Sequence, residues 1–390
     1  MKIVFLVNHL NATDGWSRYT LDLATNLQAQ GHEVHCLVNK KSAADFIQYD
    51  ILGSPLRYLA NPFLSFTTAL KINKIIAKIK PDIIHITTET YATFLPFIKL
   101  KSAKTVLTVH GTYAYQPHLL ANPFKRWISS MFTNYLYQKV DRVIAVSHYT
   151  KDHLLKNLPT SHLSDLVSKK ITVITNGLDL SSFPPTSSAV EKNHVVKNIL
   201  FVGGVKSGKG ILETLAGLAD YKNNFSDQFQ FTIVGSFDSQ SKYYLSLKDF
   251  IAEEKLNAHV VFLGRISDAE LLSHYQSADL FLMPSLNIDG KWIEGFGLVY
   301  LEAASQGVPC LGSTESGASD AIIDGQTGYL INAHNPAGMA EKLDLILNKR
   351  PIKPEDCVAW AVKNDIKLKV GEVEDIYNKL SSKLQETSSK

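Results

Sequence analysis

Cysteine is scarce in this sequence, and that scarcity limits the kind of protein that it encodes. The 390 residues include only three cysteines, Cys36, Cys310 and Cys357, all in apolar surroundings and without the spacing of metal ligands. Cysteines in such a setting are typically small core residues of a protein from a reducing compartment. We therefore expect neither a disulfide framework nor a cysteine-bound metal.

Long apolar runs are missing as well. No segment offers the roughly 18 or more apolar residues that a membrane-spanning helix needs. The N-terminal sequence MKIVFLVNHL has only a short apolar run and no small-residue cleavage site, so it predicts a first buried strand and not a signal peptide. We expect a cytoplasmic protein.

Neither sign of charge dominates the chain. Forty Lys and Arg against 37 Asp and Glu give a net charge of +3, which indicates little about partners, and we expect no nucleic acid among them. Hydrophobic residues at 45% and charged residues at 20% exclude a disordered class and a multispanning membrane class. A chain of 390 residues is too long for one ordinary core, so two domains are expected.

The first part of the chain alternates short apolar strands with helices. The expected strands are Lys2–Val7, Glu33–Val38, Ile83–Thr87, Thr105–Val109, Arg142–Val146 and Ile171–Thr175. The expected helices between them are Tyr19–Gln30, Thr67–Lys80 and Asn122–Gln138. This alternation predicts an α/β fold with a doubly wound parallel sheet.

The pattern breaks after residue 175 and then begins again. Asn176-Gly177 and Pro184-Pro185 mark a linker, and a second α/β domain starts at residue 198. Its expected strands are Ile199–Val202, Gln230–Val234, Val260–Phe262, Leu280–Met283, Val308–Leu311 and Gly328–Ile331. Its expected helices are Ile211–Asp220, Tyr243–Glu254, Asp268–Ser277, Leu298–Ser305 and Pro336–Leu347, followed by a helical run over Glu355–Leu384.

These boundaries predict four parts of the chain. We expect an N-terminal acceptor-side domain at 1–180, a linker at 181–197 and a donor domain at 198–365. A C-terminal helix at 366–390 is expected to pack back toward the N-terminal domain.

The stretch from Trp292 to Gly312 predicts a loop, a helix and a strand in close succession, with Gly307 at the left-handed position that ends the helix. Gly295 and Gly297 stand just before the helix. Glycines there let the backbone approach a ligand, and the free N–H groups and positive dipole end of the first turn favour an anion. A phosphate group would suit this position.

Two carboxylates, Glu294 and Glu302, bracket the predicted anion site with seven residues between them. Carboxylates repel phosphate, so we expect these two to accept hydrogen bonds from hydroxyl groups of a ligand. A nucleotide-sugar has the matching order of ribose, diphosphate and sugar. The alternative is that one glutamate is only a favourable partner of the helix dipole and the other is solvated.

Together with SGASD from Ser316 and DGQTGYLI from Asp324, this stretch resembles the Glu-x7-Glu region of the retaining, GT-B-fold glycosyltransferases. The resemblance implies two Rossmann-like, doubly wound parallel-sheet domains that face each other across a cleft. It also implies that Glu294 faces the donor sugar and Glu302 the ribose. The backbone amides of Phe296, Gly297 and Leu298 would hold the diphosphate.

The segment FVGGVKSGKG from Phe201 allows two interpretations. Gly203, Gly208 and Lys209 match most of a Walker A phosphate loop, but Gly210 stands where such NTPases need Ser or Thr for magnesium. The glycosyltransferase family has Gly-Arg and then Lys-Gly here, both basic residues binding the diphosphate. Gly204 replaces that arginine, Lys209 is retained, and Lys206 is close enough in sequence to supply the missing charge.

Four further donor-site residues follow strands. The segment VLTVHGTYA places His110 before Gly111, which resembles the family's His-Gly segment beside the donor sugar. Gly15 follows the first strand. Arg265 and Ile266 follow strand Val260–Phe262, where relatives bind the nucleobase. The alternatives are a structural histidine and a solvated arginine.

The resemblance implies a retaining, hexosyltransferase-type transfer of sugar from a UDP- or GDP-sugar to a hydroxyl group of a glycan or a lipid-linked acceptor. His110, Lys209 and Glu294 are the expected catalytic residues. No cofactor and no metal are expected to be required, because the lysines and helix N-termini would neutralise the leaving diphosphate. The alternatives are a catalytically inactive nucleotide-sugar-binding protein of the same fold and a phosphate-loop NTPase.

Residues 122–139, NPFKRWISSMFTNYLYQK, place apolar side chains close to one helical face, beside Lys125, Arg126 and Lys139. An interfacial helix has this composition, so we expect peripheral contact with the inner face of the cell membrane. The alternative is a core helix of the α/β fold, for which the same pattern is suitable.

Overall fold

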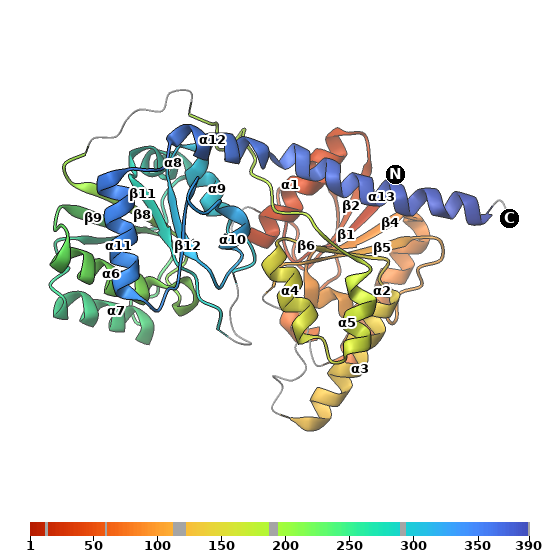
Figure 1. Ribbon diagram of the computed structural model, residues 1–390. Helices are drawn as coiled ribbons and strands as arrows, with labels where there is room; N and C mark the ends of the chain where they lie inside the picture. The colour runs from red at the N-terminus through yellow and green to blue at the C-terminus, as the bar shows by residue number, and fades with distance from the viewer. Residues whose placement is uncertain (12–14, 59–60, 112–121, 187–193, 289–293, 389–390) are drawn as a thin grey trace. The chain divides into compact units, whose positions relative to one another are not determined.

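The computed structural model describes residues 1–11, 15–58, 61–111, 122–186, 194–288 and 294–388, with side chains to residue 382 (Figure 1). It comprises two compact units. Unit 1 contains Met1–Asn176 and Ile366–Lys390, and unit 2 contains Gly177–Asp365. The first two residues of the stretch from Trp292 to Gly312 lie outside the described parts.

Unit 1 is built on a seven-stranded sheet in the order β3-β2-β1-β4-β5-β6-β7, and every pair of neighbouring strands is parallel. Its strands are β1 Lys2–Leu6, β2 Glu33–Val38, β3 Ile47–Asp50, β4 Ile83–Ile86, β5 Lys104–Val109, β6 Arg142–Ala145 and β7 Ile171–Val173. The winding direction reverses between β1 and β4. Loops that leave the carboxyl ends of strands around such a reversal are where ligands bind in open parallel sheets.

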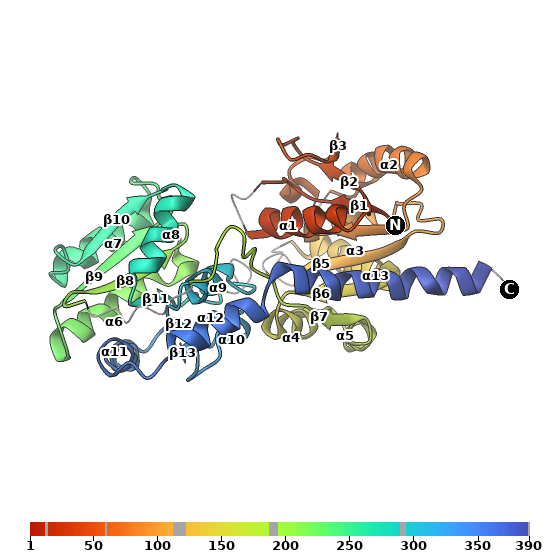
Figure 2. The ribbon, with the colours of Figure 1, turned by 90° about the horizontal axis from the view of Figure 1, so that it is seen from above.

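The sheet of unit 1 is covered on both faces, as its apolar strands require. Its helices are α1 Gly15–Ala29, α2 Pro62–Ile79, α3 Pro123–Lys139, α4 His148–Asn157, α5 Ser161–Ser168 and α13 Ile366–Ser388, with short 3-10 helices η1 Pro55–Tyr58 and η2 Glu89–Phe94. Alternate side chains of β1 pack on opposite faces of the sheet. Ile3 and Phe5 pack under α1 and α13, and Val4 and Leu6 pack against the face covered by α2 to α5 (Figures 1 and 2).

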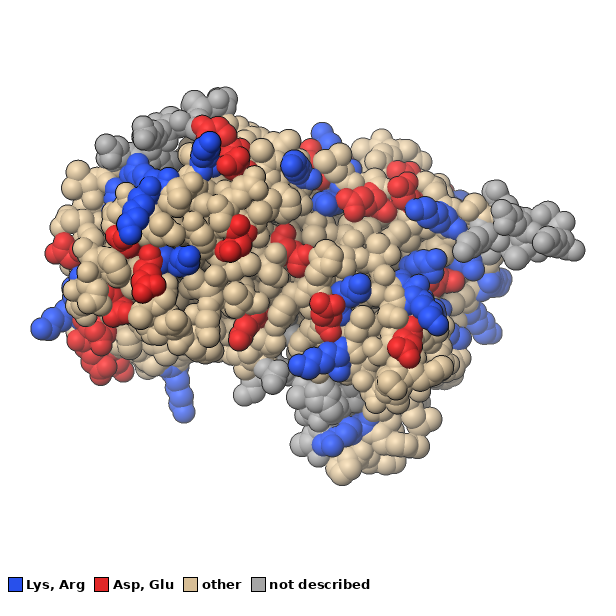
Figure 3. Space-filling view, in the orientation of Figure 1, with Lys and Arg blue, Asp and Glu red and all other residues tan. Residues whose placement is uncertain are grey.

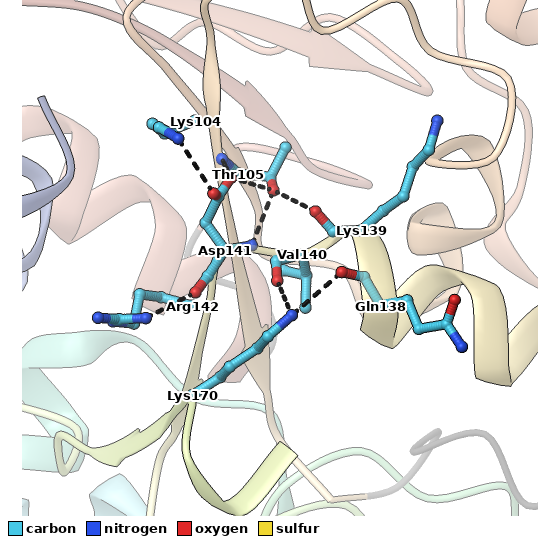
Figure 4. A network of polar contacts seen from close by, with 8 residues as sticks. All are labelled: Lys104, Thr105, Gln138, Lys139, Val140, Asp141, Arg142 and Lys170. Atoms are coloured by element: carbon cyan, nitrogen blue, oxygen red, sulfur yellow. Dashed lines mark hydrogen bonds and ion pairs between the residues drawn. The ribbon is translucent and has the colours of Figure 1, made fainter. Parts of the chain in front are cut away.

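Helix α3 is fixed at both ends by polar contacts. At its start, the Asn122 side-chain oxygen accepts hydrogen bonds from the N–H groups of Phe124 and Lys125, at 3.0 and 3.1 Å. At its end, the Lys170 ammonium donates to the carbonyl oxygens of residues 137, 138 and 140, at 3.2, 3.1 and 2.9 Å. Figure 4 shows the bonds to residues 138 and 140. The last carbonyl groups of a helix lack partners within the helix, so Lys170 caps α3.

Unit 2 contains a six-stranded parallel sheet in the order β10-β9-β8-β11-β12-β13. Its strands are β8 Lys197–Val202, β9 Phe229–Val234, β10 Val260–Gly264, β11 Leu280–Met283, β12 Cys310–Ser313 and β13 Gly328–Ile331. Its helices are α6 Ile211–Asn224, α7 Lys242–Glu253, α8 Asp268–Ser277, α9 Leu298–Ser305, α10 Ala318–Ala321, α11 Pro336–Asp344 and α12 Pro354–Lys363, with the short helices η4 Ser207–Lys209 and η5 Leu345–Lys349. The winding reverses between β8 and β11.

The predicted fold class is confirmed, since both units are α/β with doubly wound parallel sheets. All three cysteines are buried and free, as expected. The helix of the central stretch ends at Ser305, and Gly307 adopts the predicted left-handed conformation with φ +68°.

Several element predictions were wrong. The sequence did not predict β3, α4 or α5, and α2 begins at Pro62 because Asn61 caps it through Leu64 N at 3.0 Å. The helical run over Glu355–Leu384 is two helices, α12 and α13. It breaks where the carbonyl oxygen of Asn364 accepts the N–H of Leu178 at 2.8 Å.

Candidate active site

The loop after β8 gathers two lysine side chains over a pair of glycines. A Cβ atom at Gly203 would lie 3.6 Å from Cε of Lys209, and one at Gly204 would lie 3.8 Å from Cε of Lys206. The side chain of Lys206 therefore lies beside the position where the side chain of an arginine at 204 would begin.

Gly210, which follows Lys209, cannot carry a side chain. Its φ is +72°, and an added Cβ would lie 2.1 Å from the carbonyl oxygen of Pro284. A Ser or Thr hydroxyl therefore has no room at this position. The magnesium ligand of a Walker A loop is sterically excluded here, which argues against the NTPase alternative.

Lys209 and Glu294 form an ion pair, with the Lys209 ammonium donating a hydrogen bond to Oε2 of Glu294. Their side chains are only 15% and 14% exposed. The structure thus brings together the two catalytic residues that were predicted in unit 2, although they are 85 positions apart in the sequence. A lysine ammonium has three donors, so Lys209 can hold Glu294 and still donate to a phosphate oxygen.

The main chain around Glu294 is fixed by the start of α10. The N–H of Gly317 donates to the carbonyl oxygen of Glu294 at 2.8 Å. A Cβ at Gly317 would lie 2.0 Å from the carbonyl oxygen of Gly295, so only glycine allows this approach. The SGASD segment therefore holds the backbone that carries Glu294.

Helix α9 begins directly after this backbone. Gly297 caps it, Leu298 is its first residue, and the side chain of Phe296 is buried. The N–H groups of its first turn are the ones that a helix leaves available for an anion.

Glu302 lies on α9 and is 7% exposed, so it is not a solvated glutamate. The hydroxyl of Tyr275 donates to its Oε2 at 2.8 Å. This bond fixes one carboxylate oxygen of Glu302.

Arg265 and Ile266 follow β10, at the edge of the sheet. Arg265 is exposed and Ile266 is half-buried. Within the described part of unit 2, no hydrogen bond or ion pair joins Arg265 to Lys209 or Glu294. Strand β9 separates β10 from β8 in the sheet.

In unit 1, His110 follows β5 and is 4% exposed. Its ring centroid lies 5.9 Å from that of Trp16 and 5.1 Å from that of Tyr19, which meets it edge-on. Gly15 is the first residue of α1 and precedes Trp16. The start of α1 and His110 therefore lie side by side.

The sequence did not identify Glu89, which contacts the same strand end. Its Oε1 accepts hydrogen bonds from the N–H groups of His110 and Gly111, the second at 3.1 Å. Burial raises the pKa of Glu89 to about 7, although the two N–H groups act in the opposite direction. The available signal was a glutamate three residues after the apolar strand Ile83–Ile86.

Metal ligands of the usual kind do not cluster in the described parts of the chain. No group of three or more His, Cys, Asp or Glu residues in them is placed to hold a metal ion.

Comparisons with known proteins agree with both units. Residues 13–182 match the family described as Glycosyltransferase Family 4, and residues 185–363 match Glycosyl transferases group 1. A capsular polysaccharide biosynthesis glycosyltransferase of Staphylococcus aureus is 26% identical over 57% of this chain and 57% of its own length. Alignments with three other curated relatives span 42 to 60% of those relatives, and the alignment with a glycogen synthase of Mycobacterium tuberculosis, at 25% identity, spans 86% of this chain and 82% of that enzyme.

Solved structures share the fold over nearly the whole chain. A glycosyltransferase from Rickettsia africae has a TM-score of 0.77 at 23% identity and covers 97% of this chain and 98% of its own. Anabaena HepE, solved in complex with UDP and glucose, has a TM-score of 0.73 at 16% identity and covers 97% and 100%. Because the two family matches run from residue 13 to 363 and these folds align with both units, the chain belongs to the GT-B glycosyltransferases, with a family 4 half followed by a group 1 half.

Proposed function

We propose that this protein transfers a sugar, with retention at the anomeric carbon, from a UDP- or GDP-sugar to a hydroxyl group. The Lys209–Glu294 ion pair beside the N-terminus of α9 is the observation that carries this proposal. It places a cation for phosphate next to a carboxylate for sugar hydroxyls. The UDP and glucose in the related HepE structure support a donor of this class.

In this proposal, each part of the donor is bound by different residues. Lys209, Lys206 and the amides of Phe296, Gly297 and Leu298 would bind the diphosphate, and Glu302 would bind the ribose. Arg265 and Ile266 would lie against the base, and Gly15, His110 and Glu294 against the sugar. These groups are preorganised for the charge that develops on the leaving phosphate, which is why we propose transfer without a metal ion.

The chemical step exchanges one bond at the anomeric carbon for another. The acceptor oxygen bonds to this carbon as its bond to the phosphate oxygen breaks. The departing phosphate takes the proton of the acceptor hydroxyl on the same face of the sugar. Lys209 then neutralises the negative charge that accumulates on the diphosphate.

A direct assay tests this function. Wild-type protein is incubated with single UDP- and GDP-sugars, and free nucleotide and glycosylated product are measured by mass spectrometry. Release of nucleotide with one donor supports transfer. Tight donor binding without release would favour an inactive nucleotide-sugar-binding protein, a possibility raised by Gly204 in place of the family arginine.

The acceptor that we propose is a glycan or lipid-linked saccharide at the cytoplasmic face of the membrane. The three free, buried cysteines suit a reducing compartment. The related Staphylococcus aureus protein is named for capsular polysaccharide biosynthesis. No helix in the described ranges combines the length and the apolarity needed to cross a bilayer.

Helix α3 supports contact at the membrane surface. Its exposed apolar residues recur at helical spacing, and they are Phe124, Trp127, Met131 and Tyr135. Phe124 and Trp127 are 66% and 59% exposed, whereas the buried side chains belong to the second half of the helix. The alternative of an ordinary core helix therefore suits only that second half. Figure 3 shows basic and uncharged residues over the lower end of α3.

Helix α2 extends this surface. Phe63, Phe66 and Leu70 are exposed on α2, and Phe66 is linked to Phe132 of α3 through Phe97, with ring centroids 5.5 and 5.9 Å apart. Segments 61–81 and 122–140 contain no Asp or Glu and seven basic residues, namely Lys71, Lys74, Lys78, Lys80, Lys125, Arg126 and Lys139. We call these segments the α2–α3 surface. Exposed apolar residues among basic ones suit an anionic lipid layer.

Reversing charge on the α2–α3 surface is expected to weaken lipid binding. The double variant Lys125→Glu, Arg126→Glu should lose more than about tenfold in affinity for anionic vesicles, because each basic residue contributes about 1 kcal/mol there. High salt should act in the same direction. Co-sedimentation with phosphatidylglycerol-containing vesicles measures this, and Lys242→Glu, Lys248→Glu on α7 is the matched control. If wild type stays in the supernatant at low salt, α3 has no membrane role.

Lys206 is expected to replace the arginine missing at 204. Lys206→Ala should weaken UDP or GDP binding by about tenfold, because charge-assisted contacts contribute about 1.5–3 kcal/mol. Gly204→Arg in that background should restore binding, since a side chain at 204 meets only ordinary contacts of 3.7 Å or more. Calorimetric titration with the nucleotide measures both. Unchanged affinity in Lys206→Ala would show that this lysine is only solvated.

A further inference from the structure

Glu89 lies where β4 and β5 end, although it is not part of the donor site described above. It is the first residue of η2 and is 4% exposed. One oxygen, Oε1, accepts the N–H groups of both residues that leave β5, His110 and Gly111. A single carboxylate oxygen thus fixes the backbone on which the histidine stands.

The second oxygen of Glu89 is buried and has no hydrogen-bond partner among the residues that the structure describes. No Lys or Arg within those residues forms an ion pair with it. Burying a carboxylate without a counter-ion is costly, and its pKa of about 7 reflects that cost. Costly groups of this kind are concentrated at functional sites.

A purely structural contact would not need the charge. The side-chain oxygen of a glutamine could accept the same two N–H groups without burying an ionised group. What glutamate adds is a pair of charge-assisted hydrogen bonds, which are roughly twice as strong as neutral ones. It also adds a protonation state that changes near neutral pH.

The His110 ring is restrained separately from its backbone. Trp16 and Tyr19 pack against the imidazole, with ring centroids 5.9 and 5.1 Å away. The hydroxyl of Tyr19 is itself hydrogen-bonded with Oγ1 of Thr108 on β5, at 3.2 Å. Aromatic packing restricts the orientation of the His110 ring, while Glu89 fixes the backbone that carries this side chain.

We propose that Glu89 is a positioning residue for sugar transfer, whose carboxylate holds the His110–Gly111 backbone and so sets the place of the His110 imidazole. This inference rests on the proposed function, in which His110 contacts the donor sugar. The ionised carboxylate holds the histidine firmly and the protonated carboxyl holds it weakly.

Neighbouring titratable groups do not obscure this ionisation. Those on β4, η2 and α1 are His85, Tyr91, Tyr19 and the Arg18–Asp22 ion pair. Burial lowers the pKa of His85 to about 3, with a smaller effect of His110, and burial raises the pKa of Tyr19 to about 12. Burial also raises the pKa of Tyr91 far above neutrality. Among these groups, Glu89 is the one whose pKa lies at about 7.

Glu89→Gln tests the proposal through its rate and its pH profile. At pH 8, kcat should fall roughly tenfold with the donor KM little changed, because a displaced catalytic group costs up to about 10²-fold. The wild-type kcat should rise with pH through about 7, as Glu89 ionises. The variant should lack that rise.

Thermal unfolding gives a second readout that needs no substrate. Because the folded-state pKa of Glu89 is raised from 4.5 to about 7, wild type should lose stability as pH rises through that interval. Glu89→Gln carries no charge and should not, so its melting temperature should exceed that of wild type at pH 8 and equal it near pH 4.5. Glu372→Gln, which removes an exposed carboxylate of unit 1, should show neither effect.

Each outcome decides something. Lower kcat with a higher melting temperature at pH 8 supports the proposal. Wild-type kcat with the same pH profile overturns it, and so does a parallel loss of activity and stability, which would mark a structural carboxylate.

If wild type transfers no sugar, the proposed function fails. The imidazole NMR signal of His110 then tests the positioning alone, and it should shift on Glu89→Gln.

Discussion

Lys209→Ala is expected to lower kcat for sugar transfer about 100-fold, and Glu294→Ala should do so by a similar factor. Removing one preorganised electrostatic contact from a site where charge develops has costs of this order. In Lys209→Ala, the carboxylate of Glu294 also remains largely buried, 14% exposed, without its cation and close to the path of the diphosphate. Donor KM should therefore rise as well. Glu302→Ala should act mainly on donor affinity.

A double-mutant cycle tests whether Lys209 and Glu294 act together in catalysis or independently. Since Lys209 and Glu294 are in contact, Lys209→Ala combined with Glu294→Ala should lose clearly less than the roughly 10⁴-fold product of the single effects. Lys349→Ala, which breaks the ion pair between the exposed Lys349 and Asp344, is the matched control and should leave kcat unchanged. Near-normal turnover in both single variants with a donor that wild type uses would show that the site is wrongly assigned.

Strands and their winding could be predicted because the information is local. Buried parallel strands are continuous apolar runs, so β1 and β4 are recognisable within a few residues of sequence. Helix ends depend on one or two residues, such as Gly307 after α9. β3 was missed because its sequence IQYD carries two polar residues and none of its side chains is fully buried. The break between α12 and α13 depends on Leu178, which is far away in the sequence.

The candidate site was predictable only in the parts that share one segment. Glu294 and Glu302 stand eight positions apart, so the helix that begins just after Glu294 and carries Glu302 could be inferred. The ion pair of Lys209 with Glu294 and the bonds of Glu89 to the His110 backbone join residues 85 and 21 positions apart. Such contacts arise because parallel strands deliver their carboxyl ends to one edge, and the sequence alone does not tell which side chains then meet. The roles of Glu89, and of Gly317 within the SGASD segment, are therefore recognised only in the folded chain.

Gly317→Ala is expected to disrupt the site without touching any predicted catalytic side chain. The new Cβ would lie 2.0 Å from the carbonyl oxygen of Gly295, so the start of α10 or the backbone of Gly295 must move by roughly 1.4 Å or more to reach ordinary contact. This movement should break the bond from Gly317 N to the carbonyl oxygen of Glu294. We expect kcat to fall on the order of 100-fold, since displacement by about 1 Å has that effect.

Stability should fall less than activity in this variant. Inserting one methyl group into a close-packed contact costs about 1–3 kcal/mol, which leaves most domains folded at room temperature. Thermal unfolding and kcat are therefore to be measured together, with Ser319→Ala as the control. That change lies on the same helix, keeps the existing Cβ and removes only a hydroxyl bond of 3.2 Å to Ser316. A folded Gly317→Ala protein with wild-type kcat would mean that α10 does not hold Glu294 in place, because a shifted backbone cannot leave the carboxylate in its paired position beside Lys209.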